Sequence, residues 1–130
     1  MSRIKTILLW VMGLAYVAVG VNHFVMPATY EAIMPPYLPW HRELVWISGA
    51  AEIALGILVL VPKTRVLAAW GLVALLIAVF PANLHMALNP ADFDIPRWVL
   101  YLRLPLQGLF IAWALWYTRA EPDVAASRTD

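Results

Sequence analysis

Seven polar side chains lie inside stretches that are otherwise apolar and long enough to be membrane-spanning helices. When these stretches are aligned across a bilayer, all seven fall in the same half of it. An ionisable group in hydrocarbon costs about 2.5 to 3.5 kcal/mol on insertion scales, so such groups are expected to face a shared interior site. There, a carboxylate can accept protons, and imidazoles and amides can hydrogen-bond a ligand. These candidate ligand-binding residues are Asn22, His23, Glu52, Asn83, His85, Arg103 and Gln107.

Glu52 and Arg103 are expected to be partners, because a buried carboxylate and a buried guanidinium stabilise each other. Ser48 precedes Glu52 by one helical turn and Gln107 follows Arg103 by one turn, so the four side chains would form a ladder between two helices. Two interpretations are open. The pair either fixes helix register as a buried ion pair, or Glu52 acts as a proton acceptor or ligand anchor.

The two histidines within the apolar stretches are expected to point into one cavity, since His23 shares a helix face with Tyr16 and His85 shares one with Ala82. They could hydrogen-bond their neighbours, contact a ligand or relay protons, or hold a haem iron or a divalent metal together with Glu52. The chain has no HxxE or HxxxH spacing, and four-helix carboxylate centres use Glu-x-x-His motifs. The sequence therefore disfavours haem and divalent metal, and we assign no metal ligand.

The composition predicts one membrane domain. Of 130 residues, 63% are hydrophobic and 13% charged, whereas an ordinary soluble domain is nearer half apolar and a quarter charged. Apolar runs at residues 4–25, 44–61, 66–88 and 98–117 each have about the 20 residues that cross a bilayer as a helix. The predicted fold class is all-α, an integral membrane four-helix bundle over residues 1–118, followed by a cytoplasmic tail at residues 119–130 that is expected to be disordered.

Basic residues are distributed unequally between the two ends of the predicted bundle. By the positive-inside rule, both termini are expected to be cytoplasmic and the seven polar side chains to lie in the outer half. The first apolar run is too long for a signal peptide and lacks a cleavage pattern, so it is expected to remain as a helix. The basic residues on the cytoplasmic side are Arg3, Lys5, Lys63, Arg65, Arg119 and Arg128, and only Arg42 and Arg97 flank the other side.

Residues 26–43, between the first two runs, contain four of the ten prolines together with several aromatic side chains. Prolines preset the backbone and apolar side chains seek burial, so this short interfacial segment is expected to roof the bundle, with a helical turn around residues 30–33. The short connection at residues 62–65 predicts that the second and third helices are antiparallel neighbours.

Small residues are expected to bring helices into close contact. The main candidates are Gly13 and Gly20 on the first helix, and Gly49 and Gly56 on the second. The contact would lie either within the bundle or between copies of the chain.

Several classes of function are excluded. The chain has no cysteine, which rules out thiol–disulfide chemistry and thiolate metal sites. Gly-x-Ser-x-Gly motifs, phosphate-binding loops and basic patches for nucleic acid are missing. Four short spans without repeat symmetry disfavour a complete secondary transporter unless the chain forms oligomers. The expected partners are the lipid bilayer, a small amphipathic molecule, and other membrane subunits or a second copy of the chain.

Five peptides together resemble the DoxX-like family of small bacterial membrane proteins. They are NHF at residues 22–24, PPYLP at 35–39, SGAAEIALG at 48–56, VFPANLHMAL at 79–88 and RLPLQ at 103–107. The resemblance implies a four-helix integral membrane protein of the bacterial cytoplasmic (inner) membrane, with either quinone-linked redox work or membrane-protein assembly as its role. The family's recurring polar positions map onto the seven side chains that membrane energetics also selects.

The predicted function is binding of a small amphipathic molecule in a polar pocket of the outer half, with a quinone as the leading candidate. His23, His85 and Asn83 would donate hydrogen bonds to its carbonyl oxygens, and Glu52 would relay protons. Such a protein would be a redox accessory subunit, and no residue receives a catalytic role. The alternative is an assembly factor or structural partner of another membrane complex, in which the polar network only holds the bundle's shape. The aromatic side chains expected to cover a bound ring are Phe24, Tyr30, Tyr37 and Phe80.

Overall fold

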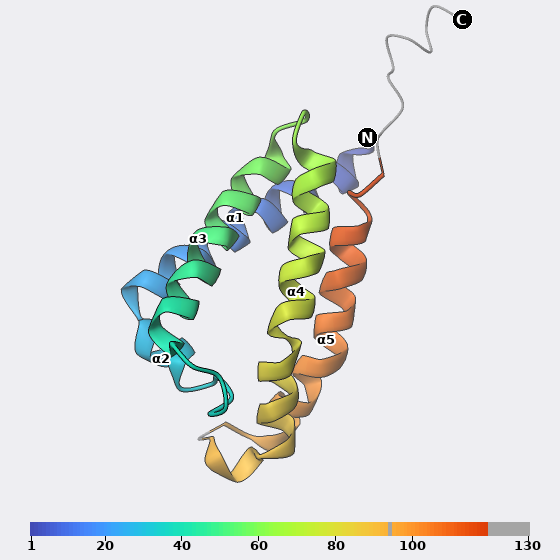
Figure 1. The fold of residues 1–130 in the computed structure, drawn as a ribbon. Helices are drawn as coiled ribbons and strands as arrows, with labels where there is room; N and C mark the ends of the chain where they lie inside the picture. Colours follow the sequence, from blue (N-terminus) through green and yellow to red (C-terminus); the bar gives the residue numbers. More distant parts are fainter. Residues whose placement is uncertain (94, 120–130) are drawn as a thin grey trace, which may run out of the picture.

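Four long helices make up most of the chain. In the computed structural model, which describes residues 1–93 and 95–119, they are α1 (Arg3–Val25), α3 (His41–Leu60), α4 (Arg65–Leu88) and α5 (Arg97–Leu115) (Figure 1). The short helix α2 (Pro27–Glu31) and the 3-10 turn η1 (Pro90–Asp92) lie in the connections, and the described residues contain no strand. The all-α part of the predicted fold class is therefore confirmed for the described residues. Each long helix is also apolar and long enough to cross a membrane, while insertion into a membrane stays a prediction. The predicted tail at residues 119–130 lies outside the described residues, apart from Arg119.

Local chemistry at the helix ends sets the boundaries. α1 begins after Ser2, whose hydroxyl accepts a hydrogen bond from the backbone N–H of Lys5 at 3.1 Å. The turn expected at residues 30–33 forms earlier in the chain, because Pro27 has the fixed φ that suits the first position of a helix. α3 begins at His41, before the predicted residue 44, because its first turn is built from polar residues that the apolar run did not include.

The connection between α3 and α4 is fixed by the side chains that begin α4. Thr64 Oγ1 donates to the carbonyl oxygen of Leu58 at 2.7 Å, and the guanidinium of Arg65 donates to those of Val59 and Leu60 at 2.9 and 3.0 Å. These carbonyls lie in the last turn of α3, where a cation satisfies both the hydrogen bonds and the helix dipole. The predicted antiparallel contact of these two helices is confirmed.

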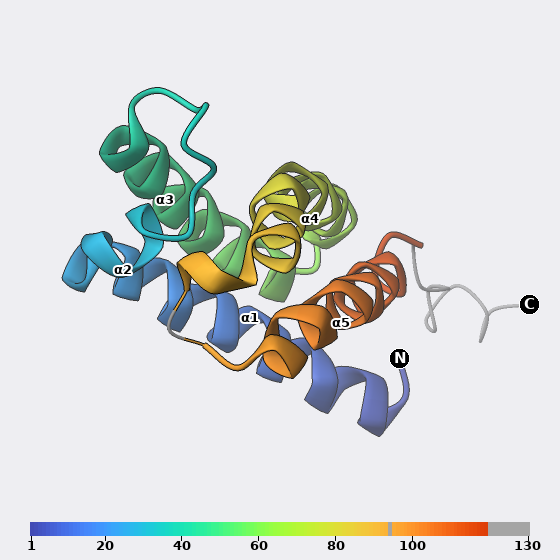
Figure 2. The same ribbon diagram turned by 90° about the horizontal axis from the view of Figure 1, so that it is seen from below.

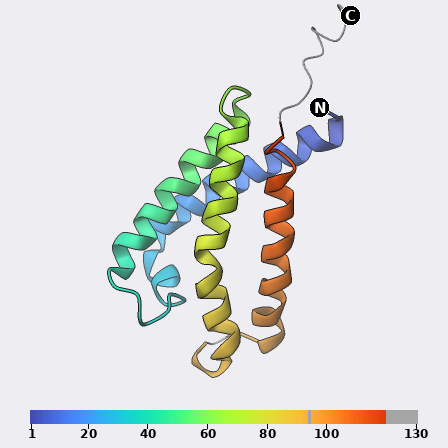
Figure 3. The ribbon, with the colours of Figure 1, turned by 45° about the vertical axis from the view of Figure 1, so that its right-hand side comes forward.

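The long helices associate mainly as two pairs, α1 with α3 and α4 with α5. Figures 1 and 3 show the start of α1, the end of α5 and the α3–α4 turn at one end of the bundle, called the terminal end here. The α1–α3 and α4–α5 connections lie at the opposite loop end, and the two pairs diverge toward it. The buried hydrophobic core joins the pairs near the terminal end, through residues Leu9, Met12, Val59, Ala68, Ala69, Leu72, Val73, Leu76, Ala114 and Tyr117.

α1 packs on α3 along a seam of four glycines, which we call the glycine seam. A Cβ added at Gly13 would lie 2.8 Å from the carbonyl oxygen of Gly56, and one added at Gly20 would lie 2.6 Å from that of Gly49. The spacing between the two glycines is the same on both helices, so the antiparallel pair approaches closely at two levels. The expected close contact through these small residues is confirmed within the bundle.

The end of α2 and the segment that follows it are held against the start of α3 by polar contacts. Arg42 Nε donates to Glu31 Oε1 at 3.0 Å and Arg42 Nη2 donates to Oε2 at 3.3 Å, and these bonds lower the pKa of the Glu31 carboxyl. The His41 imidazole lies 3.2 Å from the carbonyl oxygen of Pro35. Figure 2 shows α2 and the loop that follows it beside α1 and α3 at the loop end.

Candidate ligand-binding cavity

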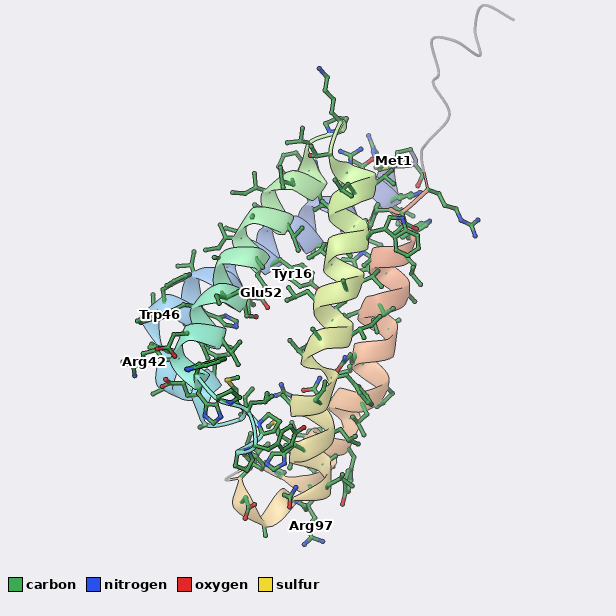
Figure 4. All side chains as sticks on the ribbon, in the orientation of Figure 1. Met1, Tyr16, Arg42, Trp46, Glu52 and Arg97 are labelled. Atoms are coloured by element: carbon green, nitrogen blue, oxygen red, sulfur yellow. The ribbon has the colours of Figure 1, made fainter. Side chains whose placement is uncertain are left out.

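A cavity of about 800 Å³ lies between the two helix pairs in the loop-end half of the bundle. Apolar side chains from all four long helices form most of its wall, and Tyr30, Met34 and Tyr37 from the segment between α1 and α3 also line it. The segment between α1 and α3 thus forms part of the cavity wall, and its predicted place at the membrane interface stays a prediction. Figure 4 shows Tyr16 and Glu52 pointing into the space between α3 and α4. The predicted site residues that line the cavity are His23, Glu52, Asn83 and Arg103.

His23 of α1 and Glu52 of α3 form the first polar cluster of the cavity. His23 is only 6% exposed, and its Nδ1 lies 2.7 Å from the carbonyl oxygen of Val19 and 3.5 Å from Glu52 Oε2. The shorter contact identifies the Nδ1–H as a donor to Val19. Glu52 Oε2 is buried and has no hydrogen-bond partner among the described residues. Because Glu52 also lines the cavity, its carboxyl group can meet a ligand there.

Asn22 supports this cluster from behind and does not line the cavity, contrary to its predicted role in direct ligand contact. Its Nδ2 donates to the hydroxyl oxygen of Tyr30 at 2.7 Å. The ring of Tyr30 stacks on the imidazole of His23 with the ring centroids 3.8 Å apart. Asn22 thus positions the aromatic ring that covers His23.

Arg103, Asn83 and Gln107 form the second polar cluster, between α5 and α4. Arg103 Nε donates to Asn83 Oδ1 at 3.2 Å, and Asn83 Nδ2 donates to Gln107 Oε1. Gln107 Nε2 in turn donates to the backbone carbonyl oxygen of Leu76. Gln107 is 4% exposed and does not line the large cavity, but with Asn83 and Arg103 it lines a smaller one of about 150 Å³. Arg103 therefore lines both cavities.

The predicted ion pair between Glu52 and Arg103 does not form, and this expectation was wrong. Among the described residues, the His23 imidazole lies 3.5 Å from Glu52 Oε2, and Arg103 is hydrogen-bonded to Asn83. The two side chains belong to different helix pairs, α3 packing on α1 and α5 on α4, and the cavity lies between them. The proposed ladder through Ser48 is also absent from the described hydrogen bonds, although Ser48 lines the cavity.

His85 lies outside the cavity, so the prediction that both histidines share it was wrong. Asn89 Nδ2 lies 3.3 Å from His85 Nδ1 and donates to the His85 carbonyl oxygen at 2.9 Å. The edge of the imidazole meets the ring of Phe93, with centroids 6.0 Å apart. These contacts hold His85 at the end of α4, where it orders the connection to η1.

The cavity brings together no histidine pair that could bracket an iron, because only His23 of the two faces it. The residues that the structure describes contain no group of three or more His, Asp or Glu side chains placed to hold a metal ion. His23 and Glu52 could supply two metal ligands, but the described residues place no third His, Asp or Glu beside them. The expectation of no haem or metal stays a prediction.

Aromatic side chains line the cavity, but only partly those predicted. Tyr30 and Tyr37 do so, whereas Phe24 and Phe80 do not. Tyr16, Phe110 and Trp113 line it as well, and only Tyr16 had been assigned to this region, through its shared face with His23. A signal for Phe110 exists in the sequence, since it follows Arg103 by two helical turns and so shares its face.

Residues 12–118 match a family model described as a domain of unknown function, DUF8561. The match includes both polar clusters and the segment between α1 and α3. No curated protein and no solved structure matches the chain. The resemblance to DoxX-like proteins stays a prediction, because the matching family has no described activity.

Proposed function

The chain belongs to the DUF8561 family, a domain family of unknown function, and we propose that it is an integral membrane protein that binds a small amphipathic molecule. The observation that carries this proposal is the cavity of about 800 Å³ with mostly apolar walls and two separate polar clusters. Small-molecule sites of 300 to about 1,000 Å³ commonly combine apolar walls with a few oriented polar groups. A quinone is the leading candidate ligand, and the role is that of an accessory subunit in membrane redox chemistry.

Insertion into a membrane is supported by the apolar side chains that the long helices present outward. Ile4 on α1, Ile47 on α3, Leu67 on α4 and Leu109 on α5 are 68%, 64%, 77% and 59% exposed. A soluble monomer rarely exposes a contiguous apolar surface of this kind, whereas in lipid these side chains are already in apolar surroundings. We place the protein in the bacterial cytoplasmic (inner) membrane, on the basis of its resemblance to DoxX-like proteins.

Charge bias sets the proposed orientation, with the terminal end cytoplasmic. Lys63 lies in the α3–α4 turn at the terminal end and Asp92 lies in η1 at the loop end, and both are exposed. Because the natural chain has no cysteine, Asp92→Cys and Lys63→Cys each introduce one thiol. A membrane-impermeant maleimide is expected to label Asp92→Cys in spheroplasts, and to label Lys63→Cys only after the membrane is opened. The reverse pattern would show that the termini are periplasmic.

A quinone, taken together with its reduced hydroquinone form, fits the cavity for three physical reasons. Arg103 can donate a hydrogen bond to a carbonyl oxygen, and Glu52 can accept a hydrogen bond from a hydroxyl group. Aromatic side chains such as Tyr37 and Trp113, which line the cavity, can contact the quinone ring. The polar clusters also lie in the loop-end half, near the level at which the head group of a lipid-soluble molecule meets the membrane surface.

Binding of a short-chain quinone tests this proposal. Titration of the purified protein in detergent is expected to quench tryptophan fluorescence saturably, since Trp113 lines the cavity. Ala51 also lines it, so Ala51→Phe should fill part of the site and weaken binding by about tenfold or more, a loss of at least 1.4 kcal/mol. The neighbouring Ala50 is exposed and does not line the cavity, so Ala50→Phe is the matched control and should bind like the natural protein.

His85→Ala is a second control, because His85 lies outside the cavity, and it is expected to leave quinone affinity unchanged. Quenching that is linear in quinone concentration and equal in all variants would remove the support for a binding site. The assembly-factor alternative would then be preferred, with the polar clusters serving only to hold the two helix pairs in place.

A further inference from the structure

The hydrogen bonds of the Arg103 cluster run in one direction. At one end of this row of hydrogen bonds, the guanidinium of Arg103 can only donate. At the other end, the backbone carbonyl of Leu76 can only accept. Between them, the side-chain oxygens of Asn83 and Gln107 each accept the bond from the preceding group. Both amides are therefore fixed in orientation. What the cluster offers to a ligand is the set of remaining N–H donors on Arg103, whose Nη atoms have no partner among the described residues.

The cluster of His23 and Glu52 offers groups of the opposite kind. The Nδ1–H of His23 is already donated to the carbonyl oxygen of Val19 at 2.7 Å, so in the neutral ring Nε2 is an acceptor. Glu52 Oε2 is buried without a hydrogen-bond partner among the described residues, and a carboxylate can only accept. The cavity thus has an acceptor wall, formed by His23 and Glu52, and a donor wall, formed by Arg103.

We propose that the polar head of the ligand has two unlike ends, a hydrogen-bond donor that meets Glu52 and an oxygen acceptor that meets Arg103. This assignment rests on the proposed function and makes its ligand class more specific. A quinone carries acceptor oxygens at both ends of its ring, whereas a hydroquinone carries hydroxyl groups that donate as well as accept. The class that fits both walls is the hydroquinone, or a phenol with an oxygen substituent on the far side of the ring.

The other polar side chains of the cavity do not discriminate between the two forms. The hydroxyl groups of Ser48, Tyr16 and Tyr30 line it, and each can donate or accept. Selectivity therefore rests on Glu52. A carbonyl oxygen placed against the Glu52 carboxylate would bring two acceptors together, and the loss of water from the carboxylate would stay uncompensated.

Anaerobic calorimetric titration tests the assignment. The purified protein is titrated separately with a short-chain quinone and with the corresponding hydroquinone. The hydroquinone is expected to bind about tenfold or more tightly, the ratio typical of one hydrogen bond to a charged group. In Glu52→Gln the ratio should fall to within about threefold, because an amide can donate as well as accept. His85→Ala, outside the cavity, should keep the ratio of the natural protein.

Equal affinity of the natural protein for the two forms would overturn the assignment of two unlike ends, while the cavity would stand as a quinone site. An unchanged ratio in Glu52→Gln would also overturn it, since Glu52 would then not be the selecting group. If neither form binds saturably, the quinone proposal itself fails and this assignment fails with it. Should Glu52→Gln not fold, the ratio measured for the natural protein decides.

Discussion

Replacing Gly20 with alanine is expected to destabilise the protein by about 1 to 3 kcal/mol, the usual cost of overpacking a close contact. A Cβ at Gly20 would lie 2.6 Å from the carbonyl oxygen of Gly49 and 2.7 Å from Cγ1 of Ile53. The carbonyl belongs to the backbone and cannot rotate away, so α1 would have to move off α3. Thermal unfolding in detergent, followed by circular dichroism, measures the resulting fall in melting temperature.

Gly108 supplies the matched control for this substitution. It is exposed on α5, and a Cβ added there meets nothing within 4 Å. Alanine is favoured over glycine inside a helix by about 0.5 to 1 kcal/mol, so Gly108→Ala is expected to hold or raise the melting temperature. Similar losses in Gly20→Ala and Gly108→Ala would contradict the glycine seam, because a loss at Gly108, where the added Cβ meets nothing, cannot come from the α1–α3 contact.

The glycine seam also sets the geometry of the acceptor wall. A Cβ at Gly49 would lie 2.7 Å from the Cβ of His23, so the backbone of α3 lies directly against that side chain. Glu52 follows Gly49 by about one helical turn and therefore lies on the same face of α3. The close approach of the two helices is what brings the imidazole within 3.5 Å of the carboxylate. Fold stability and cavity chemistry depend on the same contact.

Apolar run length was enough to predict the four long helices, because about 20 apolar residues are needed to cross a bilayer and few other structures contain such runs. It was not enough to place their ends. α3 begins at His41, in polar residues that precede the apolar run, and α2 begins at Pro27, whose fixed φ suits the start of a helix. Those ends depend on single side chains, whereas the length of an apolar run reflects the average hydropathy of many residues.

The seven polar side chains were found from the energetic cost of placing them in hydrocarbon, and four of them line one cavity. Their pairing was not predictable in the same way. The helical repeat predicts which residues of one helix share a face. Which residues that face contacts depends on which helices pack together. Glu52 was therefore assigned to Arg103, when α3 in fact packs on α1 and brings His23 to it.

A usable signal for that pairing was present in the glycines. Gly13 and Gly20 on α1 have the same spacing as Gly49 and Gly56 on α3, and equal spacing is what two antiparallel helices need to meet at two levels. Pairing α1 with α3 on this basis would have placed His23 beside Glu52. His85 carried no comparable signal, since its position depends on hydrogen bonds from Asn89, beyond the end of its helix.

Replacing Asn83 with leucine is expected to be the most destabilising change within the polar clusters. It removes the acceptor of Arg103 Nε and the donor to Gln107 Oε1 in one step. A buried group left without its partner costs about 1 to 3 kcal/mol, and Gln107, which is 4% exposed, should contribute most of the loss. The fall in melting temperature of Asn83→Leu in detergent is the measurement.

Double substitutions distinguish the observed network from the ion pair expected across the cavity. Because Asn83 and Gln107 share a hydrogen bond, Asn83→Leu combined with Gln107→Leu should cost less than the sum of the two single losses, with a coupling of about 0.5 to 3 kcal/mol. Glu52→Gln combined with Arg103→Leu should be additive to within about 0.5 kcal/mol, since these side chains have different partners. Recovery of stability in the second pair would instead show that Glu52 and Arg103 neutralise each other across the cavity, which would leave neither wall free to select a ligand.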